Sequence, residues 1–227
     1  MNLLSIDIEL NQLLTPKVIE IGAVAFKSHT GEILGTFHTY VDPKEPITEF
    51  IIGLTGITDE KVKGAPSITE AYFLLKAFHK KHRCPRNPVL WGSGVRNDSH
   101  TIWEEAKPLE ENFMGFRVID AKTLYQSLQM YSNGAIKAGL RAACDNLGIG
   151  WDSTHGPEHR AVPDAFNTAR IWHHLMHKMS VGVKMCTVKH PTPEEKANMA
   201  LKEIEKTQKF NEELRKLGIG AIRKIKE

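Results

Sequence analysis

The stretch LLSIDIEL (3–10) is a short apolar run in which two carboxylates are embedded. Because side chains alternate between the two faces of a strand, Asp7 and Glu9 share one face of the strand that this run predicts. Two like charges on one face of a central strand are costly unless a partner compensates them. Divalent cations such as Mg²⁺ bind carboxylate oxygens and would remove that cost. The alternative is an edge strand whose acids face water, and this pattern alone leaves both open.

The residues that follow predict a hairpin. KVIEIGAVAFK (17–27) and ILGTFHTYV (33–41) both have the β-branched and aromatic character of strands. The short polar segment SHTGE (28–32) carries turn residues, so the two runs are expected to pair as antiparallel strands.

Strands and helices alternate farther along the chain. A capping-box pattern at Ser67 and Glu70 predicts a helix over 67–82. The expected apolar stripe of this helix consists of Ala71, Leu74, Leu75 and Phe78. Further expected elements are a strand at 87–94, a helix from Asp98 to Ala106, a strand leading into a helix at 116–129, a helix over 136–147 closed by Gly148, and a helix beginning near Pro163. This order predicts an α/β fold with a mixed sheet flanked by helices.

Composition places the chain among soluble globular proteins. It has 227 residues, of which 41% are hydrophobic and 25% charged, enough for one large domain or one domain with a short appendage. Three scattered cysteines are too few for a disulfide framework, so a reducing, cytoplasmic setting is expected. No apolar run approaches the roughly 20 residues that span a bilayer, and no secretory signal is expected at the N-terminus.

The net charge of +3 is concentrated in the C-terminal part of the chain. Residues 189–227 hold ten Lys and Arg against seven Asp and Glu, whereas residues 1–188 are balanced. We expect a domain over 1–180 and a charged helical extension over 181–227, with an amphipathic helix at 194–216. This extension could pack on the domain, dimerise, or guide nucleic acid; its basic residues are Arg215, Lys216, Arg223, Lys224 and Lys226.

A second group of polar residues lies in HRAVPDAFNTAR (159–170). A helix that begins near Pro163 places Asp164 in its first turn and His159 on the loop before it. Histidine has the side-chain pKa nearest neutrality, which suits a general base. The alternative is that Asp164 only stabilises the helix dipole and that His159 is an ordinary surface residue.

A third candidate is Asp98, which follows a predicted strand and a glycine turn and opens a helix. Taken alone, it could be an ordinary acid at a helix start.

These segments together resemble a known family. Asp7-x-Glu9, VIEIGAVAF (18–26), LTGIT (54–58), Asp98 and HRAVPDA (159–165) follow the order of the motifs of DEDDh-type 3′→5′ exonucleases. This DnaQ-like or RNase T-like group has an RNase H-like fold. The resemblance covers roughly residues 3–178.

The resemblance implies hydrolysis of phosphodiesters at the 3′ end of single-stranded DNA or RNA, releasing nucleoside monophosphates with two Mg²⁺ or Mn²⁺ ions per active site. Asp7 would bridge both ions, Glu9 and Asp164 would hold the ion that carries the nucleophilic water, and Asp98 would support the second. His159 would be the general base.

The family also implies substrate contacts from Leu54, Thr55 and Ile57, and from Leu10 after the second acid. Two positions depart from the family pattern. Asn97 precedes Asp98 where an aromatic or apolar residue is usual, and Leu10 stands where many members have Thr or Ala.

The predicted partner is therefore a single-stranded nucleic-acid end. A homodimer, or a polymerase or repair protein as a partner chain, stays open. The competing functions are a catalytically silent binding module on the same fold and an RNase H-like endonuclease.

Three further features have more ordinary explanations. His173 and His177 have the spacing of a zinc pair, but a partly exposed helix face is the simpler interpretation. Trp91 and Trp103 could stack on bases, but core packing is expected. Asp120 is expected to cap a helix.

Overall fold

The computed structural model describes residues 1–11, 16–92, 97–107, 111–133, 139–182 and scattered positions beyond 197. Its centre is a five-stranded sheet in the order β3-β2-β1-β4-β5. The strands are β1 (Asn2–Leu10), β2 (Val18–Lys27), β3 (Ile33–Tyr40), β4 (Val89–Leu90) and β5 (Ile119–Asp120). The pairs β1–β2 and β2–β3 are antiparallel, whereas β1–β4 and β4–β5 are parallel. The predicted hairpin and mixed sheet are confirmed.

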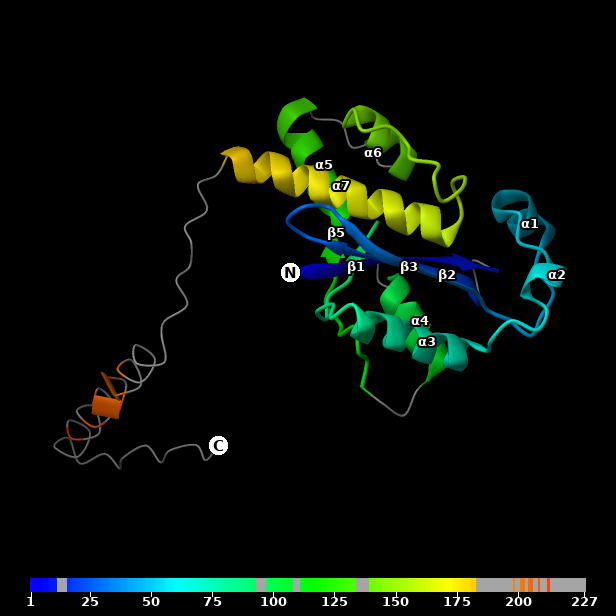
Figure 1. Cartoon of the computed structure of the whole chain (residues 1–227), viewed down its shortest axis with the longest axis horizontal. Helices are drawn as coiled ribbons and strands as arrows, with labels where there is room; N and C mark the ends of the chain where they lie inside the picture. Colours follow the sequence, from blue (N-terminus) through cyan, green and yellow to red (C-terminus); the bar gives the residue numbers. More distant parts are fainter. Residues whose placement is uncertain are drawn as a thin grey trace. The chain divides into compact units, whose positions relative to one another are not determined.

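Helices flank both faces of this sheet (Figure 1). One face carries α5 (Ala121–Asn133), α6 (Leu140–Asn146) and α7 (Ala161–Gly182), and the other carries α3 (Ile68–Lys81) and α4 (Asp98–Ala106). The short helices α1 (Glu49–Thr55) and α2 (Asp59–Val62) lie at one end of the sheet, close to the beginning of α7 (Figure 1). This arrangement is the helix-flanked mixed sheet that the sequence predicts.

Strand β1 is the central strand, so the alternative of an edge strand with acids in water is excluded. Leu4 and Ile6 pack in a core cluster with residues of α3 and α4, whereas Leu3 packs with Ala169 of α7. Since faces alternate along a strand, Asp7 and Glu9 lie on the face that α7 covers.

Helix α3 confirms its predicted cap and corrects its predicted stripe. The side chain of Ser67 accepts a hydrogen bond from the amide of Glu70, and the Glu70 carboxylate accepts one from Ser67 in return. Leu74 is 49% exposed, whereas Tyr72 is fully buried. The phenol of Tyr72 donates to the carbonyl of Glu111, a partner far along the chain that no helical periodicity reveals.

Two predicted elements differ in extent. Of the strand expected over 87–94, only Val89 and Leu90 are in a strand among the described residues, and Trp91 lies outside it; residues 93–94 lie outside the described part of the chain. Helix α7 begins at Ala161, two residues before Pro163. Of the helix expected over 136–147, residues Leu140–Asn146 form α6, and residues 136–138 lie outside the described residues. Gly148 follows with φ +71°, as its predicted closing role requires.

By its contacts the chain divides into Met1–Val183 and Lys184–Glu227. The helix expected over 194–216 and its basic residues lie largely outside the described residues, so their roles stay predictions. Within the part of the chain that the structure describes, no helix has the length and apolar character needed to cross a membrane.

Candidate active site

Three carboxylates meet where β1 ends beneath the first turn of α7. Asp7 and Glu9 come from one face of β1, and Asp164 comes from α7. One oxygen from each carboxylate lies within 4.8 Å of the others. The sequence predicted that these acids act together, although Asp164 is more than 150 residues from Asp7 and Glu9 in the chain. Their geometry is compatible with a shared cation.

The carboxylates of this cluster are buried and repel one another, so a positive ion would stabilise their charged forms. Burial, followed by repulsion from the other acids, raises the pKa of Asp7 and raises that of Glu9 to about 8. Burial also raises the pKa of Asp164 to about 7. The Oδ1 atom of Asp164 is buried without a hydrogen-bond partner. Oxygen ligands that are buried, mutually repelling and unsatisfied fit a hard divalent cation such as Mg²⁺ or Mn²⁺.

Asp98 joins the cluster from the first residue of α4. Burial raises the pKa of Asp98 to about 7, and its charge is among the causes that raise the pKa of Asp7. The helix cap is Asn97, whose side-chain oxygen accepts hydrogen bonds from the His100 amide and the Ser99 hydroxyl. The residue that departs from the family pattern thus caps α4, and Asp98 is not needed for that role.

His159 borders the cluster from the loop before α7. It has φ +58°, a left-handed conformation that costs a non-glycine residue about 1–2 kcal/mol. Its side chain is exposed, and with Asp164 it lines a pocket of about 430 Å³. The backbone amide of His159 interacts with the Asp164 carboxylate and lowers the pKa of that carboxyl. The candidate base and a candidate ligand are thus held by one short segment.

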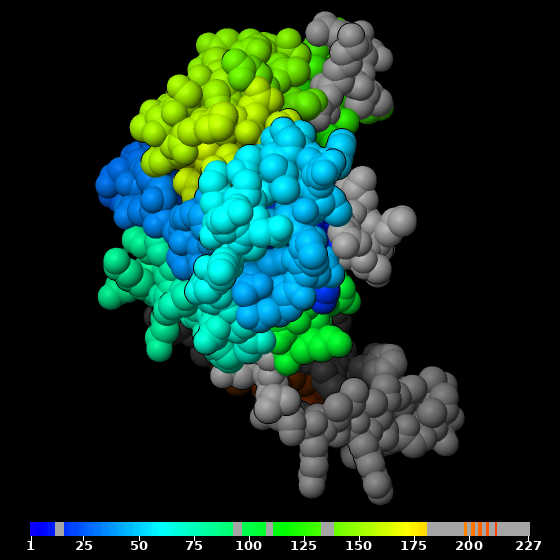
Figure 2. Space-filling view, turned by 90° about the vertical axis from the view of Figure 1, so that its right-hand side faces the viewer, coloured from blue at the N-terminus to red at the C-terminus, as the bar shows by residue number. Residues whose placement is uncertain are grey.

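The LTGIT segment lies where α1 ends, at the end of the sheet where α7 begins (Figure 1). Only part of this segment is exposed. Ile57 is fully buried, and the hydroxyl of Thr55, itself buried, donates to the Ile51 carbonyl and accepts from the Ile57 amide. Because both side chains are buried, the structure does not support the expected substrate contacts from the side chains of Thr55 and Ile57. Leu54 is 43% exposed and can reach a ligand. In Figure 2 the light-blue and cyan residues of α1 and α2 cover this end, with the yellow-green residues before α7 above them.

A buried asparagine connects the beginning of α1 to β1, the strand that carries Asp7 and Glu9. Asn11 follows β1, and Leu10 just before it is partly buried. The Asn11 amide donates to the carbonyl of Pro46, and its side-chain oxygen accepts from the amide of Thr48, the N-cap of α1. Asn11 therefore joins the end of β1 to the beginning of α1.

The more ordinary explanations of the other polar and aromatic features hold. Asp120 accepts hydrogen bonds from the amide and hydroxyl of Thr123 and caps α5. Trp91 and Trp103 pack against core clusters. Among the described residues, only the Asp7, Glu9 and Asp164 group brings three potential metal ligands together, so His173 and His177 gain no third ligand there.

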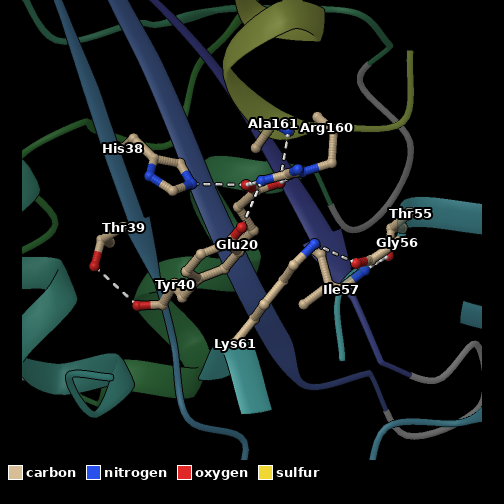
Figure 3. A network of polar contacts seen from close by, with 10 residues as sticks. All are labelled: Glu20, His38, Thr39, Tyr40, Thr55, Gly56, Ile57, Lys61, Arg160 and Ala161. Carbon is tan, nitrogen blue, oxygen red and sulfur yellow. Dashed lines mark hydrogen bonds and ion pairs between the residues drawn. The ribbon is translucent and has the colours of Figure 1, made fainter. Parts of the chain in front are cut away.

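Sequence analysis missed one buried ion pair at the site. Glu20 of β2 is 1% exposed and pairs with Arg160, the residue after His159 (Figure 3). Burial alone would raise the pKa of Glu20, but hydrogen bonds from His38, Arg160 and the Ala161 amide lower it to about 2. A carboxylate inside the apolar run of β2 was the available signal, the same signal that singles out Asp7 in β1.

The family model RNase_T, described as Exonuclease, matches residues 4–172. This chain belongs to the RNase T exonuclease family. The resemblance noted in the sequence is thereby confirmed, and within this family the chain carries an exonuclease domain.

Relatives of this RNase T family chain include much longer proteins. It is 33% identical over 184 residues to a "DNA polymerase III PolC-type" of Caldanaerobacter subterraneus subsp. tengcongensis, covering 78% of the chain and 12% of the relative. A protein with the same description from Clostridium perfringens is 32% identical over 192 residues, covering 83% and 12%. The chain therefore spans about one eighth of the length of these curated relatives.

Solved structures show the same fold. The nuclease domain of 3′hExo, described as a DEDDh family member bound to rAMP, superposes with a TM-score of 0.66 at 22% identity, covering 78% of this chain and 92% of that one. Exonuclease X in complex with 5′ overhanging duplex DNA gives a TM-score of 0.55 at 20% identity, with coverage of 78% and 92%. The predicted RNase H-like fold is confirmed.

Proposed function

We propose that this chain is a divalent-metal-dependent 3′→5′ exonuclease that removes nucleoside monophosphates from single-stranded DNA or RNA. The observation that carries the proposal is the acid cluster. Asp7, Glu9 and Asp164 converge with unsatisfied, mutually repelling carboxylates, and Asp98 and His159 stand beside them. Family membership supports the reaction class.

In the proposed mechanism the carboxylates form the binding site for two Mg²⁺ or Mn²⁺ ions. Ions bound there would activate a water molecule and neutralise charge on the scissile phosphate. Asp7, Glu9 and Asp164 would hold these ions, together with Asp98. The raised pKa values of these acids mean that cation binding must displace protons from them at neutral pH.

His159 would take the proton of the attacking water at an imidazole nitrogen. The water oxygen would form a bond to phosphorus while the bond from phosphorus to the 3′ oxygen of the preceding nucleotide breaks. That oxygen would take a proton from solvent and leave as a new 3′ hydroxyl, and the phosphate would stay on the released nucleoside monophosphate. Because His159 is exposed at the rim of its pocket, the imidazole can pass its proton to solvent before the next cycle.

Leu54 would meet the terminal nucleotide. Its exposed side chain stands on α1, which Asn11 holds to the end of β1 through Thr48. An apolar contact to the terminal sugar or base carries little sequence information, which suits an enzyme that degrades any strand from its end. Leu10 would lie along the same nucleotide.

The partner chain stays a proposal. Two relatives are described as DNA polymerases, so a polymerase is the partner that the comparisons suggest, and a repair protein or a second copy of the chain would be the alternatives.

The test is an incubation with 5′-labelled single-stranded DNA and RNA of one sequence, with Mg²⁺, Mn²⁺ or EDTA. A metal-dependent ladder that shortens from the 3′ end is the expected result, and the faster substrate identifies the preferred nucleic acid. A circular strand of the same sequence is the matched control, because an exonuclease needs an end. Cutting of the circle would establish an endonuclease, and binding without any cleavage would establish a silent module.

A further inference from the structure

Glu20 is a buried charged side chain next to the acid cluster. The proposed mechanism gives Glu20 no role. Both of its oxygens accept from Nε of Arg160 at 3.1 Å, and one also accepts from the second guanidinium nitrogen at 2.5 Å (Figure 3). The other oxygen accepts from the amide of Ala161 at 2.9 Å. His38 lies 2.7 Å away, and Tyr40 accepts from Arg160 at 2.8 Å.

These contacts fix the chain just after His159. Ala161 is the first residue of α7, and its amide is one of those that have no partner inside the helix. Glu20 supplies that partner from β2, a separation of 141 residues. Arg160, held in two directions by Glu20 and Tyr40, leaves little freedom for the backbone between it and His159.

A second residue of β2, Gly22, lets the backbone at the beginning of α7 pack directly against the strand. A Cβ atom on Gly22 would lie 2.2 Å from the backbone carbon of Ala161, so the start of α7 rests directly on the strand. In the β1–β2 ladder, Gly22 is opposite Asp7 and Glu20 is opposite Glu9. Opposite residues of paired strands share a face of the sheet. Asp7 and Glu9 of β1 therefore lie beside the two β2 residues, Gly22 and Glu20, that contact the beginning of α7.

The backbone of His159 needs such an anchor. Its left-handed conformation is unfavourable for a side chain with a Cβ and persists only where the surroundings impose it. On its C-terminal side this conformation is flanked by the contacts of Arg160 and Ala161 to Glu20, and the His159 amide itself interacts with the Asp164 carboxylate.

We propose that Glu20 and Arg160 form a positioning pair that holds His159 in register with the acid cluster and thereby sets the rate of hydrolysis. The inference rests on the proposed function. Glu20 touches no reacting atom in this scheme; it acts through the segment from His159 to Ala161. Breaking the pair should therefore affect kcat and leave substrate affinity nearly unchanged.

The experiment measures kcat and KM of the full chain on the 5′-labelled strand for Glu20→Gln, Arg160→Lys and Tyr40→Phe. Glu20→Gln should lower kcat about 10- to 100-fold, since small misplacements of catalytic groups have such effects, with KM within about twofold. Arg160→Lys keeps the charge but loses the bidentate geometry, so its kcat should fall less. Tyr40→Phe keeps the ring and should have the smallest effect.

A double-mutant cycle with His159→Ala separates positioning from a general loss of structure. If Glu20 acts through His159, adding Glu20→Gln to His159→Ala should lower the residual rate by less than about twofold. A full multiplicative loss would overturn the proposal, and so would an increase in KM at constant kcat.

Glu105→Gln is the matched control. Glu105 of α4 also accepts a backbone hydrogen bond from β2, from the Val18 amide at 2.9 Å, but this bond joins the first residue of the strand to α4 and not to α7. An equal loss of kcat in this variant would overturn the proposal. Circular dichroism at the assay temperature verifies that each variant is folded.

A wild-type chain that cleaves nothing would contradict the proposed function, and the pair then has an independent test. The imidazole NMR signal of His159, assigned with His159→Ala, should shift or broaden in Glu20→Gln and stay unchanged in Glu105→Gln. An unaltered His159 signal in Glu20→Gln would overturn the positioning role.

Discussion

At the scale of single residues, the acid cluster combines catalytic potential with a cost in stability. Asp7→Asn and Asp164→Asn keep the side-chain shape but remove a charge. We expect cleavage to fall to the level measured with EDTA, because each change removes a proposed metal ligand. We also expect a higher melting temperature in EDTA, because repulsion with the remaining acids is lost. Glu32→Gln, on the surface, is the control, and wild-type cleavage by either Asn variant would contradict the ligand assignment.

The strained backbone of His159 gives a second prediction at this scale. His159→Ala and His159→Gly both remove the proposed base, so both should lower kcat about 10²–10⁴-fold. Only glycine relieves the left-handed conformation. The Gly variant should therefore be more stable than the Ala variant by about 1–2 kcal/mol in denaturant unfolding. Equal stabilities would show that residue 159 is not held in that conformation in solution.

The raised pKa values predict how stability depends on pH. Without metal, Glu9 and Asp164 bind protons in the folded chain up to pKa values of about 8 and 7, well above their ordinary values of 4.5 and 3.8. The unfolded chain binds fewer protons in this window, so the free energy of unfolding should fall as pH rises from about 4 to 8. Thermal melts in EDTA should show this slope, and Mn²⁺ should flatten it. A pH-independent melting temperature in EDTA would contradict the shifts.

Glu20 contributes with the opposite sign. Its pKa is lowered from 4.5 to about 2, so its contribution to stability is complete above pH 4.5 and is lost as pH falls toward 2.

At the scale of elements, the contact between β2 and α7 decides where the active-site helix begins. Gly22→Ala would place a methyl group against the Ala161 backbone, and overpacking of this kind costs about 1–3 kcal/mol. The same substitution at Gly53 of α1 meets no atom within 4 Å and should stabilise by roughly 0.5–1 kcal/mol. Chemical denaturation of the two variants measures the difference, and similar values would disprove the close approach.

At the scale of the whole molecule, the domain over residues 1–183 carries every proposed catalytic residue. We expect a chain ending at residue 183 to fold cooperatively and to retain kcat, because the core clusters and the acid cluster lie within this unit. If the C-terminal extension guides nucleic acid, KM should rise in the shortened chain, and the rise should vanish at high salt. A loss of folding on truncation would contradict the predicted domain division.

Local patterns in the sequence were sufficient to predict most of the elements and to single out the acidic candidates. Alternation along LLSIDIEL placed Asp7 and Glu9 on one face, and the capping box of Ser67 and Glu70 formed as predicted. Such patterns are readable because each depends on residues a few positions apart, whose relation the backbone geometry dictates.

Only the tertiary structure decided which candidate residues are exposed and which segments hold them in place. The burial of Ile57 and Tyr72 depends on neighbours packed from distant segments. The beginning of α7 depends on a carboxylate 141 residues away in the chain, so no local signal at Pro163 could place it. Sequence by itself therefore determined the chemistry available to this protein, whereas the packing of α7 on β2 determined how that chemistry is brought together, because contacts between distant segments form only in the folded chain.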